Sequence, residues 1–273
     1  MTLDFFKYVE VPPHPSLQGI VTHYRVTGAK HLKPFIFPDY SPIFQGLIFN
    51  ICPLDNIVLQ KKEKISLKYK VYFVGQAISP SVLFSSSLNL DLVAVNFTPT
   101  GVFQLTGMRL NDFTDRIVDA EILFGKEITA LYEKIIESKS IAQSIYLIDN
   151  FLCVKARNRK KRNKACILTS LSVLKGNAGD MSIKTLQKTI KTSPKTLERA
   201  FKAEIGMTPK MFQRLLRFNQ ARQYIEEGQC TDWWEIVVRF GFYDHSHLIS
   251  EFRFFTGKTP VQYIDMLQYP SYG

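Results

Sequence analysis

A stretch of twenty residues occurs twice in the second half of this 273-residue sequence, as two diverged copies. The first copy is SPKTLERAFKAEIGMTPKMF at 193–212, and the second, 51 residues later, is DHSHLISEFRFFTGKTPVQY at 244–263. Five positions are identical in the two copies: Leu197/Leu248, Phe201/Phe252, Gly206/Gly257, Thr208/Thr259 and Pro209/Pro260. Because copies of one segment fold alike, both are predicted to form the same supersecondary structure.

The matching positions predict a helix with a defined start and stop in each copy. Ser193 and Asp244 can accept backbone N–H bonds as N-caps, and Pro194 suits the first helical position. Gly206 and Gly257 end the helices where the backbone turns left-handed, and a Thr–Pro pair then starts the next helix. Apolar residues spaced by three or four form an inward stripe in each helix: Leu197, Phe201 and Ile205, then Leu248, Phe252 and Phe255.

A short helix is predicted before each copy, and its apolar positions align at the same offset, Ile183 and Leu186 over Trp234 and Val237. A short helix, a tight turn and a second helix with a polar outer face is the helix-turn-helix unit, whose second helix can enter a DNA major groove. The helix predicted between the two units, 209–226, is roughly 27 Å long at 1.5 Å per residue. With its flanking turns it can set two reading helices about one duplex turn apart, near 34 Å.

Charge divides the chain into two unlike parts. Residues 1–152 hold 14 Lys or Arg and 14 Asp or Glu, so the whole formal net charge of +11 lies in residues 153–273. A small domain with such an excess has a polyanion as its expected partner, because Lys and Arg that neutralise phosphates release condensed counterions. The basic segment KARNRKKRNK at 155–164 has almost no apolar residues and is predicted to be a linker.

The two parts also differ in secondary-structure signals. The first has short β-type runs, LIFNI (47–51), KVYFV (70–74) and DLVAVNF (91–97), followed by two amphipathic helical patterns at 128–136 and 141–152. The second shows only helical periodicity, with helices predicted at 164–174, 183–190, 194–204, 209–226, 233–240, 245–255 and 260–268. We therefore expect an α+β chain of two domains. Residues 1–152 form a β-rich barrel or sandwich with two helices, 153–164 are the linker, and 165–273 form an all-α domain of about seven helices.

The paired units closely resemble the DNA-binding domain of the AraC/XylS family of bacterial transcriptional regulators. The resemblance covers about 164–264 and rests on the first copy, on RLLRFNQARQYI (214–225), and on EIVVRFGFYDHSHLISEFRFFTGKTPVQY (235–263), which contains the family's GFxDxSHxxxxFxxxxGxTPxxY arrangement. It implies sequence-specific binding to double-stranded DNA and, usually, activation of transcription by recruiting RNA polymerase. PHPSLQGIVTHYRV (13–26), LIFNI, and VNFTPTGVFQLTGM (95–108) followed by FTDRIVDAEILFG (113–125) are similar to the amino-terminal domain of one AraC-like subgroup. This likeness implies a domain that senses a small-molecule effector or forms a homodimer.

The resemblance also implies which side chains meet DNA. The first reading helix is expected to present Lys195, Glu198 and Arg199, with Thr196 and Lys202 near the backbone. Arg199 has the geometry for a bidentate contact to guanine, and Lys195 suits a base or a phosphate. The second is expected to present its outward polar residues and their neighbours: His245, Ser246 and Ser250, with His247 and Arg253 nearby. Family members often carry Arg or Gln near Ser250, so this helix is expected to read bases weakly or mainly to position the protein.

Other kinds of site are less well supported. Zinc binding by His245 and His247 conflicts with their spacing, because residues two apart on a helix point to nearly opposite faces. Trp233 and Trp234 are expected in the core, as are Phe252 and Phe255. No nucleophile-elbow, phosphate-loop or dinucleotide motif occurs, so no catalytic residue, metal or cofactor is expected. The alternative is a cupin-like small-molecule-binding or metal-dependent enzyme with a basic tail, for which the histidines of the first part are the metal-ligand candidates: His14, His23 and His31.

The remaining features concern location. The four cysteines, Cys52, Cys153, Cys166 and Cys230, show neither CxxC spacing nor the density of a disulfide framework, and reduced thiols are expected. The first ten residues lack the basic start and apolar run of a signal peptide, and no apolar stretch reaches the roughly 18–20 residues that span a bilayer. A cytoplasmic location without membrane association is therefore expected.

Overall fold

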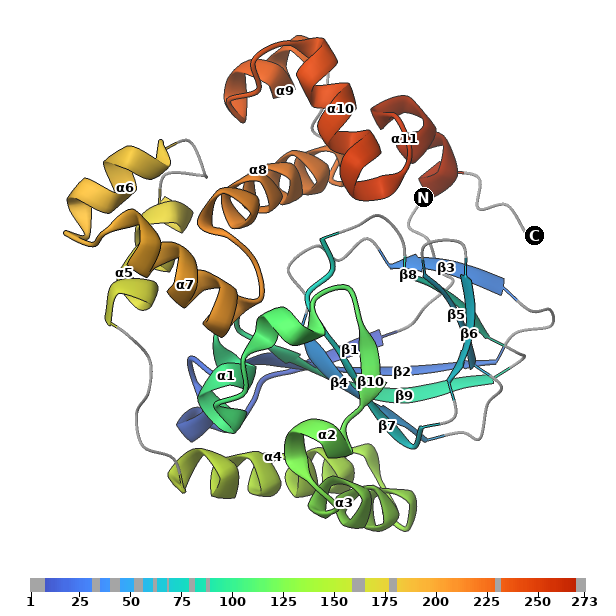
Figure 1. The fold of residues 1–273 in the computed structure, drawn as a ribbon. Helices are drawn as coiled ribbons and strands as arrows, with labels where there is room; N and C mark the ends of the chain where they lie inside the picture. The colour runs from blue at the N-terminus through green and yellow to red at the C-terminus, as the bar shows by residue number, and fades with distance from the viewer. Residues whose placement is uncertain are drawn as a thin grey trace.

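The computed structural model describes residues 8–30, 35–39, 45–51, 56–60, 63–67, 69–78, 82–86, 89–158, 165–176, 181–228 and 232–268. A β-rich domain is followed by a helical domain (Figure 1), which confirms the two-part α+β fold expected from the sequence. The helices of the second part lie beside the β-rich part and contact it through α7 (Pro194–Ile205). Within the described residues, no helix is both long and apolar enough to cross a membrane.

The described strands of the β-rich domain form two antiparallel sheets. The larger sheet has the order β1-β2-β9-β4-β7-β10, and the smaller has the order β3-β8-β5-β6. Three of these strands, β4, β7 and β9, match the three predicted β-type runs to within two residues. The strand bounds are Tyr8–Val11 (β1), Val21–Lys30 (β2), Phe35–Asp39 (β3), Gly46–Asn50 (β4), Asn56–Gln60 (β5), Glu63–Leu67 (β6), Val71–Val74 (β7), Val82–Ser86 (β8), Asn89–Phe97 (β9) and Ile117–Asp119 (β10).

The two faces of the larger sheet have different roles. One face packs on the helices of the first domain through a core that includes Leu47, Phe49 and Val95. The other face carries a smaller apolar cluster of Ile48, Tyr72, Val74 and Ala94. Figure 1 shows the four-stranded sheet on this second side, which we call the inner face. Strand register places further residues on the inner face, because directly paired residues point the same way: Gly46 pairs with Asn96, His23 with Asn96, and Asn50 with Leu92.

The part of the first domain that the structure describes also contains four α-helices and two short 3-10 turns: η1 (Pro15–Leu17), α1 (Gly101–Thr106), η2 (Leu110–Phe113), α2 (Glu121–Phe124), α3 (Glu127–Ile136) and α4 (Ile141–Arg157). The two helices predicted from periodicity are α3 and α4. Helix α4 begins at the N-cap Ser140 and continues beyond its predicted end, because Leu152 and Cys153 are still buried in the first core. The predicted linker is therefore corrected at its start: 153–157 are the last turns of α4. Residues 159–164 lie outside the described residues.

In the described residues of the second domain, seven helices lie at the positions that the periodicity and caps predicted. They are α5 (Ala165–Gly176), α6 (Ile183–Thr189), α7, α8 (Pro209–Glu226), α9 (Trp233–Arg239), α10 (His245–Thr256) and α11 (Pro260–Gln268). Helix α8 joins the two halves of the core. Its Phe212 ring lies 6.0 Å from Phe201 of α7, and its Phe218 ring lies 4.9 Å from Phe252 and 4.8 Å from Phe255 of α10. Each reading helix is thus fixed to one end of a shared helix.

Candidate nucleic-acid interface

The first helix-turn-helix unit consists of α6 and α7. The backbone reverses at Lys191, which has a φ of 49°, and α7 starts at its N-cap Ser193, whose hydroxyl accepts from the Thr196 N–H at 3.2 Å. Pro194 occupies the first helical position, where no N–H is needed. Gly206, with a φ of 93°, ends the helix. These are the start and stop residues that the sequence indicated.

The second unit, α9 and α10, repeats this plan with a longer turn. Asp244 caps α10 by accepting the His247 N–H at 2.7 Å, and Gly257 ends it at a φ of 72°. The reading helices α7 and α10 are offset by 51 residues, as predicted, but the first helices start 50 residues apart, at N-caps Ser182 and Asp232. The alignment of the short helices at offset 51 is therefore corrected by one. The second turn contains one more residue than the first.

The outward face of α7 holds the residues expected to meet DNA. Lys195, Glu198, Arg199 and Lys202 are exposed, whereas Leu197, Ala200 and Phe201 are buried against the core. Glu198 and Lys202 form an ion pair of 2.7 Å, which leaves Lys195 and Arg199 as the cations of the exposed face without an ion-pair partner among the described residues. Thr196 is half-buried, and its hydroxyl accepts from Ser193 at 2.9 Å as part of the cap.

The outward face of α10 is less polar than that of α7. His245, Ser246, Ser250 and Arg253 are exposed, and Leu248 and Phe252 are buried beneath them. His247, which the sequence also placed near DNA, is turned toward the protein. Its Nδ1 accepts the Tyr243 backbone N–H at 3.0 Å, and its Nε2 lies 3.8 Å from Glu251 Oε1.

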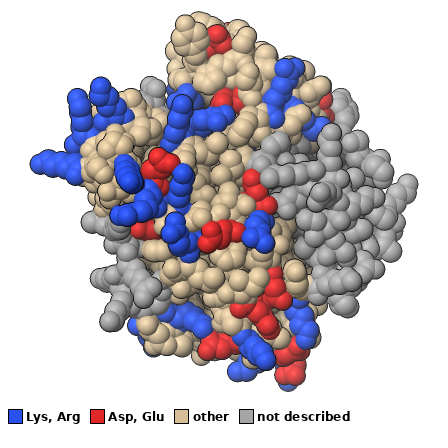
Figure 2. All heavy atoms as spheres, viewed as in Figure 1, with Lys and Arg blue, Asp and Glu red and all other residues tan. Residues whose placement is uncertain are grey.

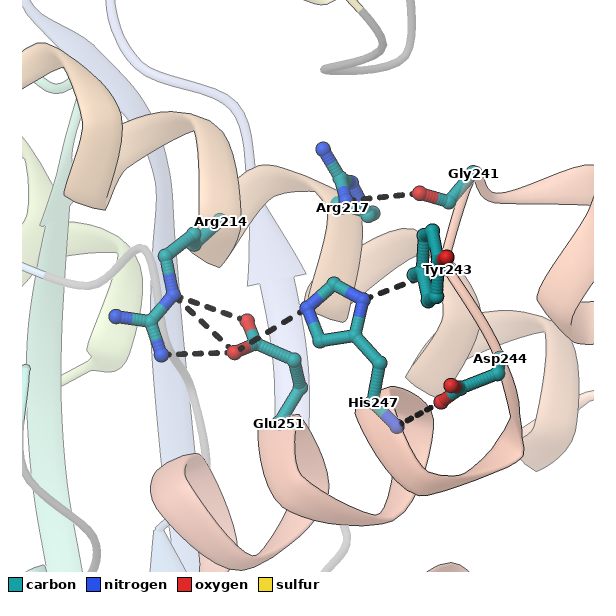
Figure 3. A network of polar contacts seen from close by, with 7 residues as sticks. All are labelled: Arg214, Arg217, Gly241, Tyr243, Asp244, His247 and Glu251. Carbon is teal, nitrogen blue, oxygen red and sulfur yellow. Dashed lines mark hydrogen bonds and ion pairs between the residues drawn. The ribbon is translucent and has the colours of Figure 1, made fainter.

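Figure 3 shows the polar network that surrounds His247 and ties α10 to α8. The buried Glu251 carboxylate accepts from Arg214 Nε at 3.2 and 3.1 Å and from its Nη2 at 2.8 Å. The Arg214 guanidinium also lies 4.4 Å from the centre of the Phe254 ring. Nearby, Arg217 Nη1 donates to the carbonyl of Gly241 at 2.8 Å, in the turn before α10. Two arginines of α8 therefore hold the second unit in place and are not part of its outward surface.

The two units differ in charge although they share a plan. Residues 182–206 hold six Lys or Arg and two Glu, a net of +4, whereas residues 232–257 hold two Arg and four Asp or Glu, a net of −2. Figure 2 shows Lys and Arg side chains gathered over α6 and α7, while the visible surface over α9 and α10 is mostly uncharged. Electrostatic attraction to phosphates is thus concentrated in the first unit.

The end of α7 is attached to the first domain by two hydrogen bonds. Gln45, just before β4, donates from Nε2 to the Ile205 carbonyl at 2.7 Å, and Thr114 Oγ1 donates to the Gly206 carbonyl at 2.6 Å. Carbonyls at a helix end have no partner within the helix, so these side chains satisfy groups that would otherwise be buried and unpaired. Ile78 of the first domain also packs on the second core.

Some functional predictions from the sequence fall elsewhere in the structure. Trp233 packs against the core as expected, but Trp234 is 52% exposed, so its assignment to the core was wrong.

Of the histidines considered as metal ligands, His14 caps η1, His23 lies beside Glu10, and His31 is outside the described residues. No group of three His, Cys, Asp or Glu side chains that could hold a metal is found among the described residues. Cys153 and Cys166 are free thiols, and Cys52 and Cys230 are outside the described residues.

Comparisons with known proteins agree with the plan of the second domain. Residues 186–266 match the family model described as a helix-turn-helix domain, and residues 9–119 match a domain of unknown function (DUF6597). No curated protein matches the chain by sequence. Among solved structures, ToxT from Vibrio cholerae O395 is similar at 10% identity and a TM-score of 0.47, covering 89% of this chain and 97% of that one. Unsaturated fatty acid bound wild-type ToxT from strain SCE256 is similar at 13% identity and a TM-score of 0.47, covering 89% and 94%.

The second domain is identified by its repeated units. Its two units carry the same caps and the same glycine stops, share α8 between them, and lie within the matched helix-turn-helix region. The second unit also contains the GFYDHSH and GKTP segments in the order and spacing noted in the sequence. The second domain is therefore an AraC-type helix-turn-helix DNA-binding domain, and a β-rich domain lies ahead of it in the chain.

Proposed function

We propose that this chain is a transcription regulator of the AraC family, and that it activates transcription after binding two successive major-groove segments on one face of DNA, one with α7 and one with α10. The observation that carries the proposal is the common attachment of both reading helices to α8, each with an exposed polar face and a buried apolar stripe. A monomer built this way presents two reading helices at once. The domain division is proposed as a first domain ending with α4, a basic linker, and a DNA-binding domain starting with α5.

Base recognition is proposed to come mainly from the first unit. Arg199 is exposed and has no ion-pair partner among the described residues, so its guanidinium is available for a bidentate contact to guanine. Lys195 lies one turn before it and suits a base or a phosphate. Thr196 and Lys202 are assigned to the backbone, and Glu198 stays paired with Lys202 until DNA competes for the lysine.

The second unit is proposed to contribute less to base readout. Its exposed polar residues are His245, Ser246, Ser250 and Arg253, and a serine hydroxyl discriminates poorly because it donates and accepts. Arg253 is the cation of this face and is assigned to a phosphate. His247 is assigned to the support of α10, since both of its ring nitrogens face protein atoms.

A gel-shift titration of the full-length protein on the DNA upstream of its own gene tests the proposal. We expect binding at about 150 mM salt to be at least about 1,000-fold tighter than to random DNA. Arg199→Ala should weaken binding to that site by about 10- to 100-fold and relax the preference at one base pair. Equal affinity of the wild type for random DNA would falsify the proposal. Uniform weakening by Arg199→Ala on all sequences would reassign Arg199 to a phosphate.

Control by a small-molecule effector is proposed through the inner face of the larger sheet. Asn50 and Asn96 are each only 8% exposed, and Asn50 Oδ1 and Asn96 Nδ2 have no hydrogen-bond partner in the described part of the chain. A buried unpaired polar group costs about 1–3 kcal/mol, so a ligand that pairs with it gains affinity. Ile48, Tyr72 and Val74 give the same face an apolar lining. Native mass spectrometry of the purified protein, with and without added candidate effectors, tests this.

Further partners follow from the proposed role. RNA polymerase is the expected partner for activation, and transcription in a purified system tests whether the bound protein raises or lowers transcript yield. A homodimer is proposed through the exposed side of α4, where Tyr146 is 64% and Val154 is 53% exposed. Sedimentation of the full-length protein decides the dimer, and cell fractionation decides the proposed cytoplasmic location.

A further inference from the structure

We infer that Trp234 and Tyr243 hold the second helix-turn-helix unit on the sugar–phosphate backbone of DNA through uncharged contacts. This inference rests on the proposed function, because it takes α10 to lie in a major groove. In a helix-turn-helix the first helix crosses the backbone while the start of the second reaches the base edges. Side chains on the first helix and in the turn, next to the start of α10, therefore face the backbone.

Trp234 and Tyr243 occupy that position and are exposed. The Trp234 ring lies 5.3 Å from the ring of His245, the first residue of α10, in an edge-on arrangement. Trp234 is 52% and Tyr243 is 88% exposed. Both residues donate from their backbone: Trp234 N–H to Asp232 Oδ1, and Tyr243 N–H to His247 Nδ1. Within the described residues, the indole N–H and the phenol O–H are thus available to phosphate oxygens.

The repeat shows which residues occupy these surface positions in the first unit. With the N-caps Ser182 and Asp232 aligned, Lys184 stands where Trp234 does, and Lys188 stands where Val238 does. Both lysines are exposed on α6, beside the cations of α7. Exposed lysines on the first helix of a helix-turn-helix suit phosphate contacts. The second unit has an indole in place of one such lysine.

Charge explains why an uncharged contact matters in the second unit. The first unit has a net charge of +4 and the second of −2. The second unit has two arginines, and Arg239 already lies 3.7 Å from Glu235. Fewer of its cations can neutralise phosphates, so hydrogen bonds and apolar contact with deoxyribose have a larger share in holding it on DNA. The longer second turn also adds a residue before the N-cap Asp244, and in this turn Tyr243 points outward while Phe242 is buried.

The salt dependence of DNA binding separates this role from an electrostatic one. The full-length protein and its variants are titrated on the upstream fragment between about 50 and 200 mM salt. Trp234→Ala and Tyr243→Phe should each weaken binding about fivefold, as expected for the loss of one uncharged hydrogen bond, with an unchanged salt slope. Lys184→Ala should reduce the salt slope by about 1, because it removes a phosphate-neutralising charge. Trp234→Lys should recover the affinity that Trp234→Ala loses, and its salt slope should exceed that of the wild type by about 1.

Matched controls make the outcomes distinct. Val261→Ala changes an apolar residue of α11 that is 54% exposed, and it should leave binding unchanged. If Trp234→Ala and Tyr243→Phe bind as tightly as the wild type, the inference is wrong. If they bind DNA normally but lose transcription activation, the surface docks a protein, which also overturns it. If the wild-type protein binds the upstream fragment no more tightly than random DNA, the proposed function and this inference are both wrong.

Discussion

At the scale of single residues, the reading helix α10 separates side chains that face outward from side chains that hold the helix. His245 and His247 are two positions apart, and only His245 is exposed. His247 joins the Tyr243 backbone to Glu251, and Glu251 in turn receives Arg214. A metal site would need both imidazoles on one side of the helix. The helical period instead turns His245 outward and His247 toward the protein.

The Glu251–Arg214 pair gives a prediction about stability. Glu251→Ala leaves the Arg214 guanidinium beside an apolar core without its carboxylate, and removal of one partner of a buried pair costs about 3–5 kcal/mol. The Arg214 side chain is 29% exposed, so we expect a loss of about 3 kcal/mol, at the low end of that range. Urea unfolding followed by circular dichroism measures it.

A double variant provides the control for this pair. Arg214→Met with Glu251→Leu replaces both charges by apolar side chains, and such replacements are often neutral or stabilising. We expect the double variant to recover most of the stability that Glu251→Ala loses. A loss below about 1 kcal/mol for Glu251→Ala would mean that the pair behaves like an exposed salt bridge.

At the scale of elements, the glycines at the ends of α7 and α8 allow a test of how α7 is attached to the first domain. Gly206 ends α7 at a φ of 93°, and Gly228 follows α8 at a φ of 69°. Gly228→Ala meets no atom within 4 Å, so it should cost only the strain of the left-handed backbone, about 1 kcal/mol. In Gly206→Ala the new Cβ lies 3.0 Å from Thr114 Oγ1 and 3.2 Å from the Leu110 carbonyl oxygen.

The difference between these two variants isolates the contact between the domains. We expect Gly206→Ala to lower the free energy of unfolding by more than Gly228→Ala, and to weaken the packing of α7 on η2, because the first domain must move away from the added methyl group. Thermal unfolding compares the two variants. Equal losses of stability would show that the close approach of Leu110 and Thr114 is not required by the fold.

The elements also show which parts of the structure the sequence could predict. The bounds of α7 and α10 depend on residues inside each segment, such as Ser193, Gly206 and Asp244, so local patterns were sufficient. The strand order was beyond local reasoning, because β4 pairs with β9 and β7, which lie far along the chain. The same limit applies to the site. Exposed cations on α7 follow from helical period, whereas the inward role of His247 depends on Arg214, 37 residues before Glu251.

At the scale of the whole molecule, one short path joins the inner face of the sheet to the first reading helix. Gln45 accepts the Phe97 N–H through its backbone carbonyl at 3.0 Å and donates from its side chain to Ile205. The next residue, Gly46, pairs with Asn96 on the inner face. We therefore expect a change in packing at Asn96 to reach the end of α7 within two contacts, and the hydrogen bonds of Gln45 and Thr114 to couple the domains.

Removal of both hydrogen bonds should loosen the end of α7. Gln45→Met with Thr114→Val keeps the approximate volume of both side chains but leaves the Ile205 and Gly206 carbonyls without their donors, a cost of about 1–3 kcal/mol for each buried group. We expect amide hydrogen exchange in the last turn of α7 to accelerate about tenfold or more, since local opening reports the lost free energy. Gln104→Met is the matched control, because the Gln104 side chain donates within the first domain, to Gly19 and Thr100. Exchange in α7 that stays at the wild-type rate in the double variant would show that the two domains are held together by apolar packing such as that of Ile78, and that these hydrogen bonds do not couple them.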